Sequence, residues 1–478
     1  MINKRRKYVT IAHCAIIKVD LLRASLPRSG WKVEALLINV SVKERWMSDQ
    51  IVIVGGGAGG LELACKLGRK LGSGHVTLVD RALYHIWKPS LHEVAAGTRD
   101  IHQEGLSYQM LAHDNKFRFV YGSMTALDNA GHSITVDAVT DESATELLPP
   151  RQIAFSKLVI AVGSVSNYFG IPGAEQNTIS LNSTEDAEHF RVRLLKMLAL
   201  ADLKKEKNPD AGVDIVIVGG GATGVELAAE LRDASSVYTD YDFPHLNPNR
   251  DVRITILEGA PRLLAPLTER VSKAASKLLQ EREVRVVTDC RVASIAENFV
   301  TDANGNDYAS DLCVWSAGIK APDFLKGLGL PVIKSGQLEV DGFLKVAGAE
   351  HIYALGDCAA CIGTDGKMVP PRAQAAHQQA DYLVEMFVRA SKGQPASDAP
   401  YVYKDHGSLV SFGRNTSVGT LMGSLTKLGW FVDGFFARMM YASLHLMHLN
   451  ALLGPVRTGV TAAASGLMKH AKPSVKLH

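Results

Sequence analysis

Two glycine-rich turns, each between a strand pattern and a helix pattern, constrain the fold of this 478-residue chain more than any other feature. The first turn spans residues 55–60 and follows the β-branched run 51–54; the second spans 219–224 and follows 214–218. Such runs are typical of strands buried on both faces. The glycines of each turn fit G-x-G-x-x-G, which allows a tight turn, close approach of a pyrophosphate and close helix packing. They are Gly55, Gly57 and Gly60 in the first turn and Gly219, Gly221 and Gly224 in the second.

An acidic residue ends the strand that follows each turn. Asp80 is in the first copy and Glu258 in the second, where residues 235–250 are predicted to form an inserted loop. Such an acid binds ribose hydroxyls, while phosphates bind the free N–H groups of the helix N-terminus. Glu258 favours NAD, because it would repel a 2′-phosphate, although the nearby Arg262 leaves NADP open. Together these patterns predict an α/β chain with two Rossmann-like dinucleotide-binding domains.

Three further buried-strand patterns end at glycine, at residues 158–164, 313–318 and 352–357. In this order they resemble the two-dinucleotide-binding-domain flavoprotein superfamily. That resemblance implies FAD on the first turn, NADH on the second, and a carboxylate of Asp357 near the ribityl chain. The residues expected to bind cofactor in these patterns are Ala161, Gly163, Ala317, Gly318, Gly356 and Asp357.

Cysteine placement separates the branches of this superfamily. Six cysteines are too few and too scattered for a disulfide framework, which favours a reducing environment. Disulfide reductases carry C-x-x-x-x-C soon after the first turn, but only Cys65 lies there, so we expect a buried helix cysteine and no dithiol relay. Cys358 and Cys361 form C-x-x-C, interpreted as two packed thiols, with a redox role or half a metal site as the open alternative. We predict no metal site.

Two segments make the resemblance more specific. Residues 81–97 include Trp87-Lys88-Pro89, and residues 369–378 contain A-Q-x-A-x-Q from Ala373 to Gln378. Both resemble the bacterial type II NADH:quinone oxidoreductases, which are single-subunit respiratory enzymes that pump no protons. The resemblance runs from about residue 48 to the C-terminus. It implies that NADH reduces FAD and that FAD then passes two electrons to a membrane quinone.

The same resemblance implies roles for individual residues. Trp87 and Lys88 would lie close to the flavin, and the A-Q-x-A-x-Q motif below its ring, beside the quinone. Amides can bond a quinone carbonyl without adding charge to an apolar slot. Glu226 would lie near nicotinamide and flavin for proton transfer, and Lys404 near the quinone head. An ordinary amphipathic helix face, a solvated acid and a surface lysine are the alternatives. The expected catalytic residues are Glu226, Gln374, Gln378 and Lys404, and Gln374 and Ala375 are also expected to contact cofactor.

The C-terminal region combines apolar residues with basic charge. Residues 428–441 are rich in aromatics and methionine, and no acid follows Asp433, whereas five basic residues do. This pattern suits a helix that lies in an anionic membrane interface. His445 and His448 argue against a spanning helix. A helix docked on the core or on a dimer partner is the alternative.

The expected organisation follows from these patterns. The FAD domain would comprise residues 47–168 and 311–404, the NADH domain 169–310, and an α-rich membrane-associating segment 405–478. Residues 1–46 are interpreted as a dispensable extension, with a targeting arm as the alternative. The resemblance implies a homodimer on the cytoplasmic face of the plasma membrane. The formal net charge of +3 is too small to argue for nucleic acid. Competing functions are a sulfide:quinone or ferredoxin reductase and a non-catalytic NADH-sensing flavoprotein.

Overall fold

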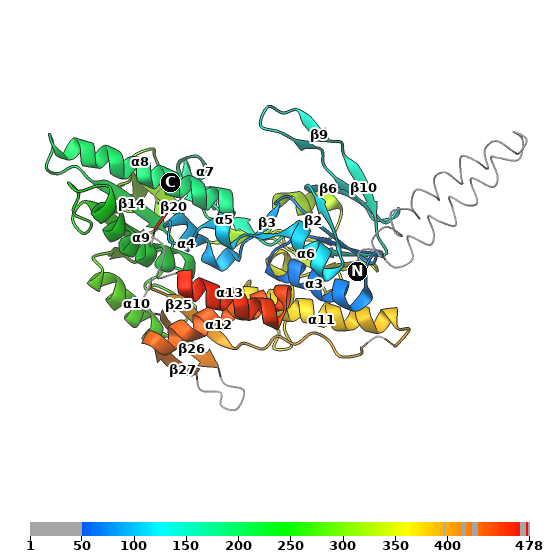
Figure 1. Cartoon of the computed structure of the whole chain (residues 1–478). Coiled ribbons are helices and arrows are strands. Elements are labelled where there is room, and N and C mark those ends of the chain that lie inside the picture. Colours follow the sequence, from blue (N-terminus) through cyan, green and yellow to red (C-terminus); the bar gives the residue numbers. More distant parts are fainter. Residues whose placement is uncertain (1–49, 396, 413–416, 423–428, 469–474, 477–478) are drawn as a thin grey trace, which may run out of the picture. The chain divides into compact units, whose positions relative to one another are not determined.

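The computed structural model describes residues 50–395, 397–412, 417–422, 429–468 and 475–476. The predicted extension 1–46 lies outside the described residues. Two five-stranded parallel sheets form the centre of the described chain (Figure 1).

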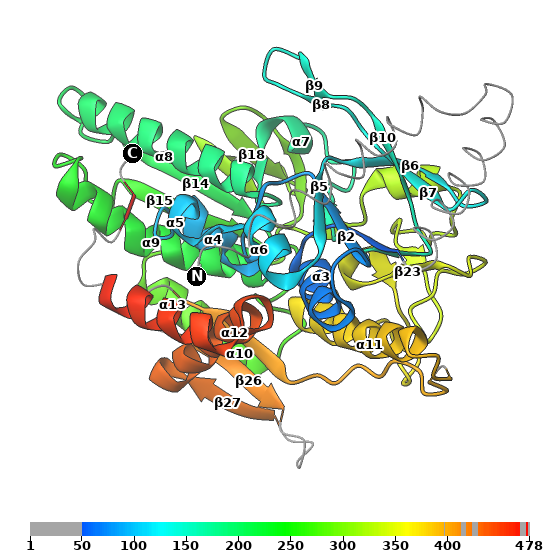
Figure 2. The same ribbon diagram turned by 45° about the vertical axis from the view of Figure 1, so that its right-hand side comes forward.

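The first sheet has the strand order β23-β11-β1-β2-β5, and every adjacent pair is parallel. Val54 at the end of β1 pairs with Val79 of β2 and Ile160 of β11, so the carboxyl ends of these strands share one edge. Helices α3 (Ala58–Leu71) and α11 (Ala373–Ser391) pack together beside this sheet (Figure 2). The strands are β1 Ile51–Val54, β2 Val76–Asp80, β5 Arg118–Tyr121, β11 Lys157–Ile160 and β23 Ile352–Ala354.

The second sheet repeats this architecture in the order β13-β20-β14-β15-β16, again with parallel pairs. Together with the first sheet it confirms the predicted α/β fold with two Rossmann-like units. Its strands are β13 Ile179–Ser180, β14 Val213–Val218, β15 Val252–Leu257, β16 Arg285–Val287 and β20 Leu312–Trp315, and its helices α8 Thr184–Lys205, α9 Ala222–Tyr241 and α10 Glu269–Glu281.

The prediction of a loop over residues 235–250 is wrong in its first half, because α9 continues to Tyr241. The hydroxyl of Ser235 donates to the Leu231 carbonyl at 2.6 Å. This bond allows serine, which usually favours turns, to lie inside the helix. Tyr238 is fully buried and donates from its hydroxyl to the Ala96 carbonyl at 2.9 Å. Tertiary packing therefore extends a helix that local composition would end.

Short elements connect and decorate the sheets. Strands β12 and β21 pair antiparallel where the chain passes between the sheets. Helix α4 packs against α8 and α9, and its apolar residues join the core of the second unit. These elements are β3 Tyr84–His85, η1 Lys88–Ser90, α4 Leu91–Ala95, α5 Ile101–Glu104, β4 Leu106–Ser107, α6 Tyr108–Asn115, β6 Met124–Asp128, β7 Ser133–Val136, β8 Val139–Thr140, β9 Glu146–Leu148, β10 Arg151–Ala154, β12 Val165–Ser166, α7 Ala174–Asn177, β17 Val292–Ile295, β18 Phe299–Asp302, β19 Asp307–Ala309, β21 Ile319–Lys320, η2 Asp323–Leu328, β22 Leu338–Glu339, η3 Gly356–Cys358 and β24 Ala359–Ala360.

The C-terminal region contains a small sheet before its helices. Strands β25 (Gly407–Ser411), β26 (Ser417–Met422) and β27 (Gly429–Asp433) pair antiparallel, and α12 (Gly434–Leu453) and α13 (Pro455–Met468) follow. The predicted helical segment thus begins as a three-stranded sheet. Helix α12 packs on α3 of the first unit (Figure 2). Within the described chain, no helix has both the length and the apolar character needed to cross a bilayer.

Candidate active site

The first glycine-rich turn, residues 55–60, forms a cradle at the N-terminus of α3. A Cβ on Gly60 would lie 2.0 Å from the Gly55 carbonyl oxygen, so helix and turn approach too closely for any side chain. At Gly57, the N-cap of α3, a Cβ would meet nothing within 4 Å, and no side chain caps the helix. Open space before uncapped N–H groups is what a pyrophosphate needs. This first cradle therefore fits a dinucleotide.

Asp80 is fixed at the first cradle by two backbone groups. Its Oδ2 accepts from the Gly56 N–H at 2.5 Å, and its Oδ1 accepts from the Ala82 N–H at 2.7 Å. Burial raises the pKa of Asp80. A Cβ on Gly55 would lie 2.4 Å from the Ala161 carbonyl oxygen, so Ala161 also lies beside the turn.

The second cradle, residues 219–224, repeats this geometry at the start of α9. Gly221 has open space and no side-chain cap, while a Cβ on Gly219 would lie 2.8 Å from the Ala317 amide nitrogen. Glu258 takes the place of Asp80, since its Oε2 accepts from the Gly220 N–H at 2.5 Å. Arg262 donates to the Ala265 carbonyl at 2.5 Å. That bond turns its guanidinium toward backbone oxygens.

A hydrogen-bonded series joins three segments of the first unit. Lys88 Nζ donates to the Ser164 carbonyl at 3.0 Å, and the Ser164 hydroxyl donates to Asp357 Oδ2 at 2.7 Å. Burial lowers the pKa of Lys88, and the nearby Asp357 opposes that shift. Gly356 has φ +73° and donates its N–H to Gln379 Oε1 at 2.7 Å. The sequence patterns did not single out Ser164, next to the predicted Gly163, or Gln379, next to Gln378. Gln379 is buried in the fold, and a glutamine in a helix pattern gives no sign of that burial.

Trp87 links the first unit to the C-terminal region. Its ring stacks on His445 of α12, with centroids 5.1 Å apart and planes 26° apart. Burial lowers the pKa of His445 to about 4, so this ring is neutral at neutral pH.

The structure brings Gln374, Gln378 and Lys404 together. Gln378 accepts from the Lys404 N–H at 3.0 Å and donates to the Lys404 carbonyl at 2.8 Å, so its amide is used at both ends. Gln374 is held more loosely, because it accepts from the Tyr403 hydroxyl at 3.3 Å and donates to the Lys404 carbonyl at 3.4 Å. The Lys404 side of this group is exposed. The loosely held Gln374 amide is the better placed of the two to exchange a partner for a ligand.

Glu226 lies in a separate, buried position between α9 and β25. Its Oε1 accepts from the Ser411 N–H at 3.0 Å, and its Oε2 lies 3.6 Å from Nδ1 of the buried His92. Burial raises the pKa of Glu226 to about 8, although the Ser411 bond opposes this. The carboxyl group therefore holds a proton at neutral pH.

The raised pKa of Glu226 predicts a pH dependence of stability. Between the ordinary pKa of 4.5 and about 8, the folded protein keeps a proton that the unfolded chain releases, so stability falls as pH rises through that interval. From pH 6 to pH 8 the loss is at most about 3 kcal/mol. Melting curves of Glu226→Gln should show a smaller decline than wild type or the exposed Glu269→Gln control. Equal declines in all three proteins would contradict the assignment.

Three buried cysteines near the first cradle are poorly suited to nucleophilic chemistry. Cys65, Cys358 and Cys361 are buried, and burial raises the pKa of Cys65 and Cys358 to about 12 and that of Cys361 to about 11. Cys358 donates to the Leu355 carbonyl at 3.3 Å. Thiols held protonated make poor attacking groups. Among the described residues, no cluster of three or more metal-ligating side chains occurs.

Comparison with known proteins places this geometry in a family. The model of the family Pyridine nucleotide-disulphide oxidoreductase matches residues 49–380. The type II NADH:quinone oxidoreductase of Haemophilus influenzae is 37% identical over 90% of this chain and 99% of its own. The Mycobacterium tuberculosis protein of that name is 27% identical over 84% of each chain.

Solved structures share the fold. NDH2 from Plasmodium falciparum in complex with NADH superposes with a TM-score of 0.74 over 90% of this chain and 99% of its own, at 19% identity. The sulfide:quinone oxidoreductase from Aquifex aeolicus superposes less closely, with a TM-score of 0.65 at 17% identity over 86% of this chain and 93% of its own. The sequence match, the repeated cradles and the fold lead to one conclusion: this chain belongs to the type II NADH:quinone oxidoreductases of the pyridine nucleotide-disulphide oxidoreductase family.

Proposed function

We infer that this protein oxidises NADH and reduces a quinone through a bound FAD. The observation that carries the proposal is the pair of cradles, each with an uncapped helix N-terminus and an acid fixed on its turn. FAD, when bound, supplies the redox chemistry that joins the two substrates. The residues of the chain then have to hold the cofactor, orient both substrates and supply protons.

We assign FAD to the first cradle, within a domain of residues 47–168 and 311–404, and NADH to the second, within residues 169–310. The turn around Gly57 would bind the FAD pyrophosphate, and Asp80 its ribose. Asp357, positioned by Ser164, would face the ribityl chain. We assign each of the other predicted cofactor-binding residues to the cradle in its own domain.

The quinone is assigned to the side of α11 that carries Gln374 and Lys404. Reducing a quinone to a quinol consumes two protons. Glu226 holds a proton at neutral pH, and the Lys404 ammonium is exposed, so both are candidates to supply one. Gln378 acts through Lys404, because both ends of its amide hold the Lys404 backbone.

We assign α12 and α13 to a membrane surface on the cytoplasmic side. Met439 and Met447 of α12 are 56% and 57% exposed, and Val456 and Leu467 of α13 are 79% and 75% exposed. Exposed apolar side chains with only basic charges suit an interfacial helix pair. A homodimer is the second assembly we propose, and part of this apolar surface would serve it.

Cofactor choice should depend on Glu258. Replacing it with serine removes the carboxylate that would repel a 2′-phosphate, so we expect the preference for NADH over NADPH, as a ratio of kcat/KM values, to fall roughly tenfold. Arg262→Ala should leave the ratio unchanged, because this guanidinium is bonded to backbone carbonyls. An unchanged ratio in Glu258→Ser would remove Glu258 from cofactor discrimination.

The overall function is tested by NADH oxidation in detergent, with and without a short-chain quinone. Fast NADH loss that requires quinone supports the proposal. If sulfide rather than NADH drives quinone reduction, the protein is a sulfide-oxidising relative. Binding of NADH without any turnover would instead favour a sensing role.

A further inference from the structure

A buried polar cluster outside the assigned site joins α3, α11 and α12. Its centre is Glu62, which is 1% exposed. Glu62 Oε1 accepts from His448 Nδ1 at 2.8 Å, and Oε2 accepts from His377 and, at 3.1 Å, from Lys66. Lys66 also donates to Asp381 at 2.6 Å. Burial alone would raise the pKa of Glu62, but these donors hold it well below its usual range.

The cluster reaches the first cradle through a second histidine. His448 Nε2 lies 2.8 Å from His85 Nε2, and His85 Nδ1 lies 3.0 Å from the Gly56 carbonyl oxygen. The Tyr108 hydroxyl donates to the same oxygen at 2.7 Å. His85 and His448 are 4% and 5% exposed, so neither bond competes with bulk water. A continuous series thus runs from α12 to the turn that we assign to the FAD pyrophosphate.

Counting hydrogens assigns a charge to this series. Glu62 and the Gly56 carbonyl are acceptors, so each requires an N–H from the ring it faces, and the bond between the rings requires a third. Two neutral imidazoles carry only two. The pair therefore carries one extra proton, balanced by the Glu62 carboxylate. Burial lowers the pKa of His85 to about 3, so a full charge on that ring is disfavoured.

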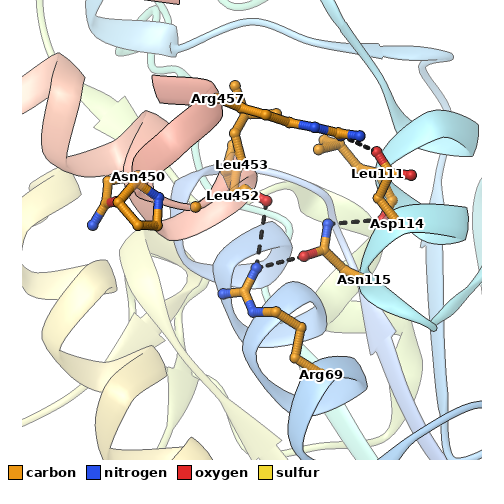
Figure 3. A pocket seen from close by; sticks show the side chains of 10 residues that line it. Arg69, Leu111, Asp114, Asn115, Asn450, Leu452, Leu453 and Arg457 are labelled. Carbon is orange, nitrogen blue, oxygen red and sulfur yellow. Dashed lines mark hydrogen bonds and ion pairs between the residues drawn. The ribbon is translucent and has the colours of Figure 1, made fainter. Parts of the chain in front are cut away.

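The series ends at a carbonyl oxygen, which cannot accept a proton for onward transfer. The series can therefore hold the Gly56 backbone in place but cannot relay a proton. A second contact holds the same helix, because Arg69 at the end of α3 donates to the Leu452 carbonyl at 3.4 Å (Figure 3). Arg69 also donates to the Ala451 carbonyl at 2.7 Å. This contact borders a pocket of about 450 Å³ and places a cation at the carboxyl end of α12, where the helix dipole favours it.

We propose that Glu62, His448 and His85 couple the seating of α12 on α3 to the position of Gly56, and thereby to how tightly the first cradle holds FAD. The inference rests on the proposed function, which places FAD in that cradle. Lys66 and His377 hold the outer oxygen of Glu62, and Asp381 accepts a further hydrogen bond from Lys66. The C-terminal helix is in this way a positioning element for the cofactor as well as a surface element.

FAD dissociation from the purified holoenzyme tests the coupling. Upon dilution, the rise in free-flavin fluorescence should be about tenfold faster in His448→Leu and Glu62→Gln than in wild type, which corresponds to one lost charge-assisted hydrogen bond. Asn450→Leu, an exposed polar-to-apolar change on the same helix, is the matched control and should release FAD at the wild-type rate. Wild-type rates in both test variants would overturn the proposal.

Two further comparisons separate positioning from general damage. Glu62→Asp keeps the charge but shortens the side chain, and Glu62→Gln keeps the shape, so the coupling predicts slower FAD release from Asp than from Gln. A role in packing alone predicts the reverse and would overturn the proposal, even if His448→Leu fails to fold. The double variant that combines His448→Leu with Glu62→Gln should release FAD no faster than the faster single variant. If the two increases in release rate add up in the double variant, the residues do not act through one shared series. Wild-type protein that lacks FAD or quinone turnover would instead refute the proposed function.

Discussion

Gly57→Ala is expected to lose roughly a thousandfold in FAD affinity while the protein still folds. The backbone φ of Gly57 is −67°, which alanine adopts without strain, and a Cβ there meets nothing within 4 Å in the folded chain. The methyl group would occupy the space needed by the pyrophosphate, costing about two charge-assisted hydrogen bonds. Flavin content after purification and far-UV circular dichroism measure the two halves of this prediction.

Gly221→Ala is the matched control in the second cradle, where φ is −74° and the space is equally open. This variant should purify with its full flavin content but show a greatly raised KM for NADH. A Gly57→Ala protein with wild-type flavin content would show that FAD does not bind at the first cradle.

Gln374→Leu is expected to reduce the rate of quinone reduction about a hundredfold while leaving flavin reduction by NADH unchanged. Its amide makes only the 3.3 and 3.4 Å contacts, so leucine should cost little stability but remove a hydrogen-bond partner proposed for the quinone carbonyl. Rapid-mixing measurements of the two half-reactions separate the effects.

Gln378→Leu provides the contrast. Its amide holds the Lys404 backbone at 2.8 and 3.0 Å, so this variant should also melt at a lower temperature. If Gln374→Leu slows the NADH half-reaction as much as the quinone half-reaction, Gln374 does not belong to the quinone site.

The sequence predicts the parts of this molecule in which local pattern and tertiary structure agree. Strand β1 was expected at residues 51–54 and is found at Ile51–Val54, because a continuous β-branched run has few other stable states. The cradles were predictable because glycine spacing reports a close backbone approach that no other residue allows. Fold, cofactors and reaction class follow from these features and from the family motifs.

Other features depend on partners far away in the chain. The extension of α9 to Tyr241 depends on Tyr238 bonding to Ala96, and local composition carries no trace of that contact. Glu62 is an ordinary acid on an amphipathic helix until His377 and His448 are brought to it from helices more than 300 residues away in sequence. His448, which argued against a spanning helix, is in the structure a buried partner of the first cradle's helix.

The most direct test of the account is anaerobic rapid mixing of the purified holoenzyme, first with NADH and then with a short-chain quinone. We expect NADH to bleach the visible absorbance of the flavin and quinone to restore it, both fast enough to support steady-state turnover. Gly221→Ala should impair the first step and Gln374→Leu the second. Flavin that NADH bleaches but quinone fails to restore would contradict the central claim.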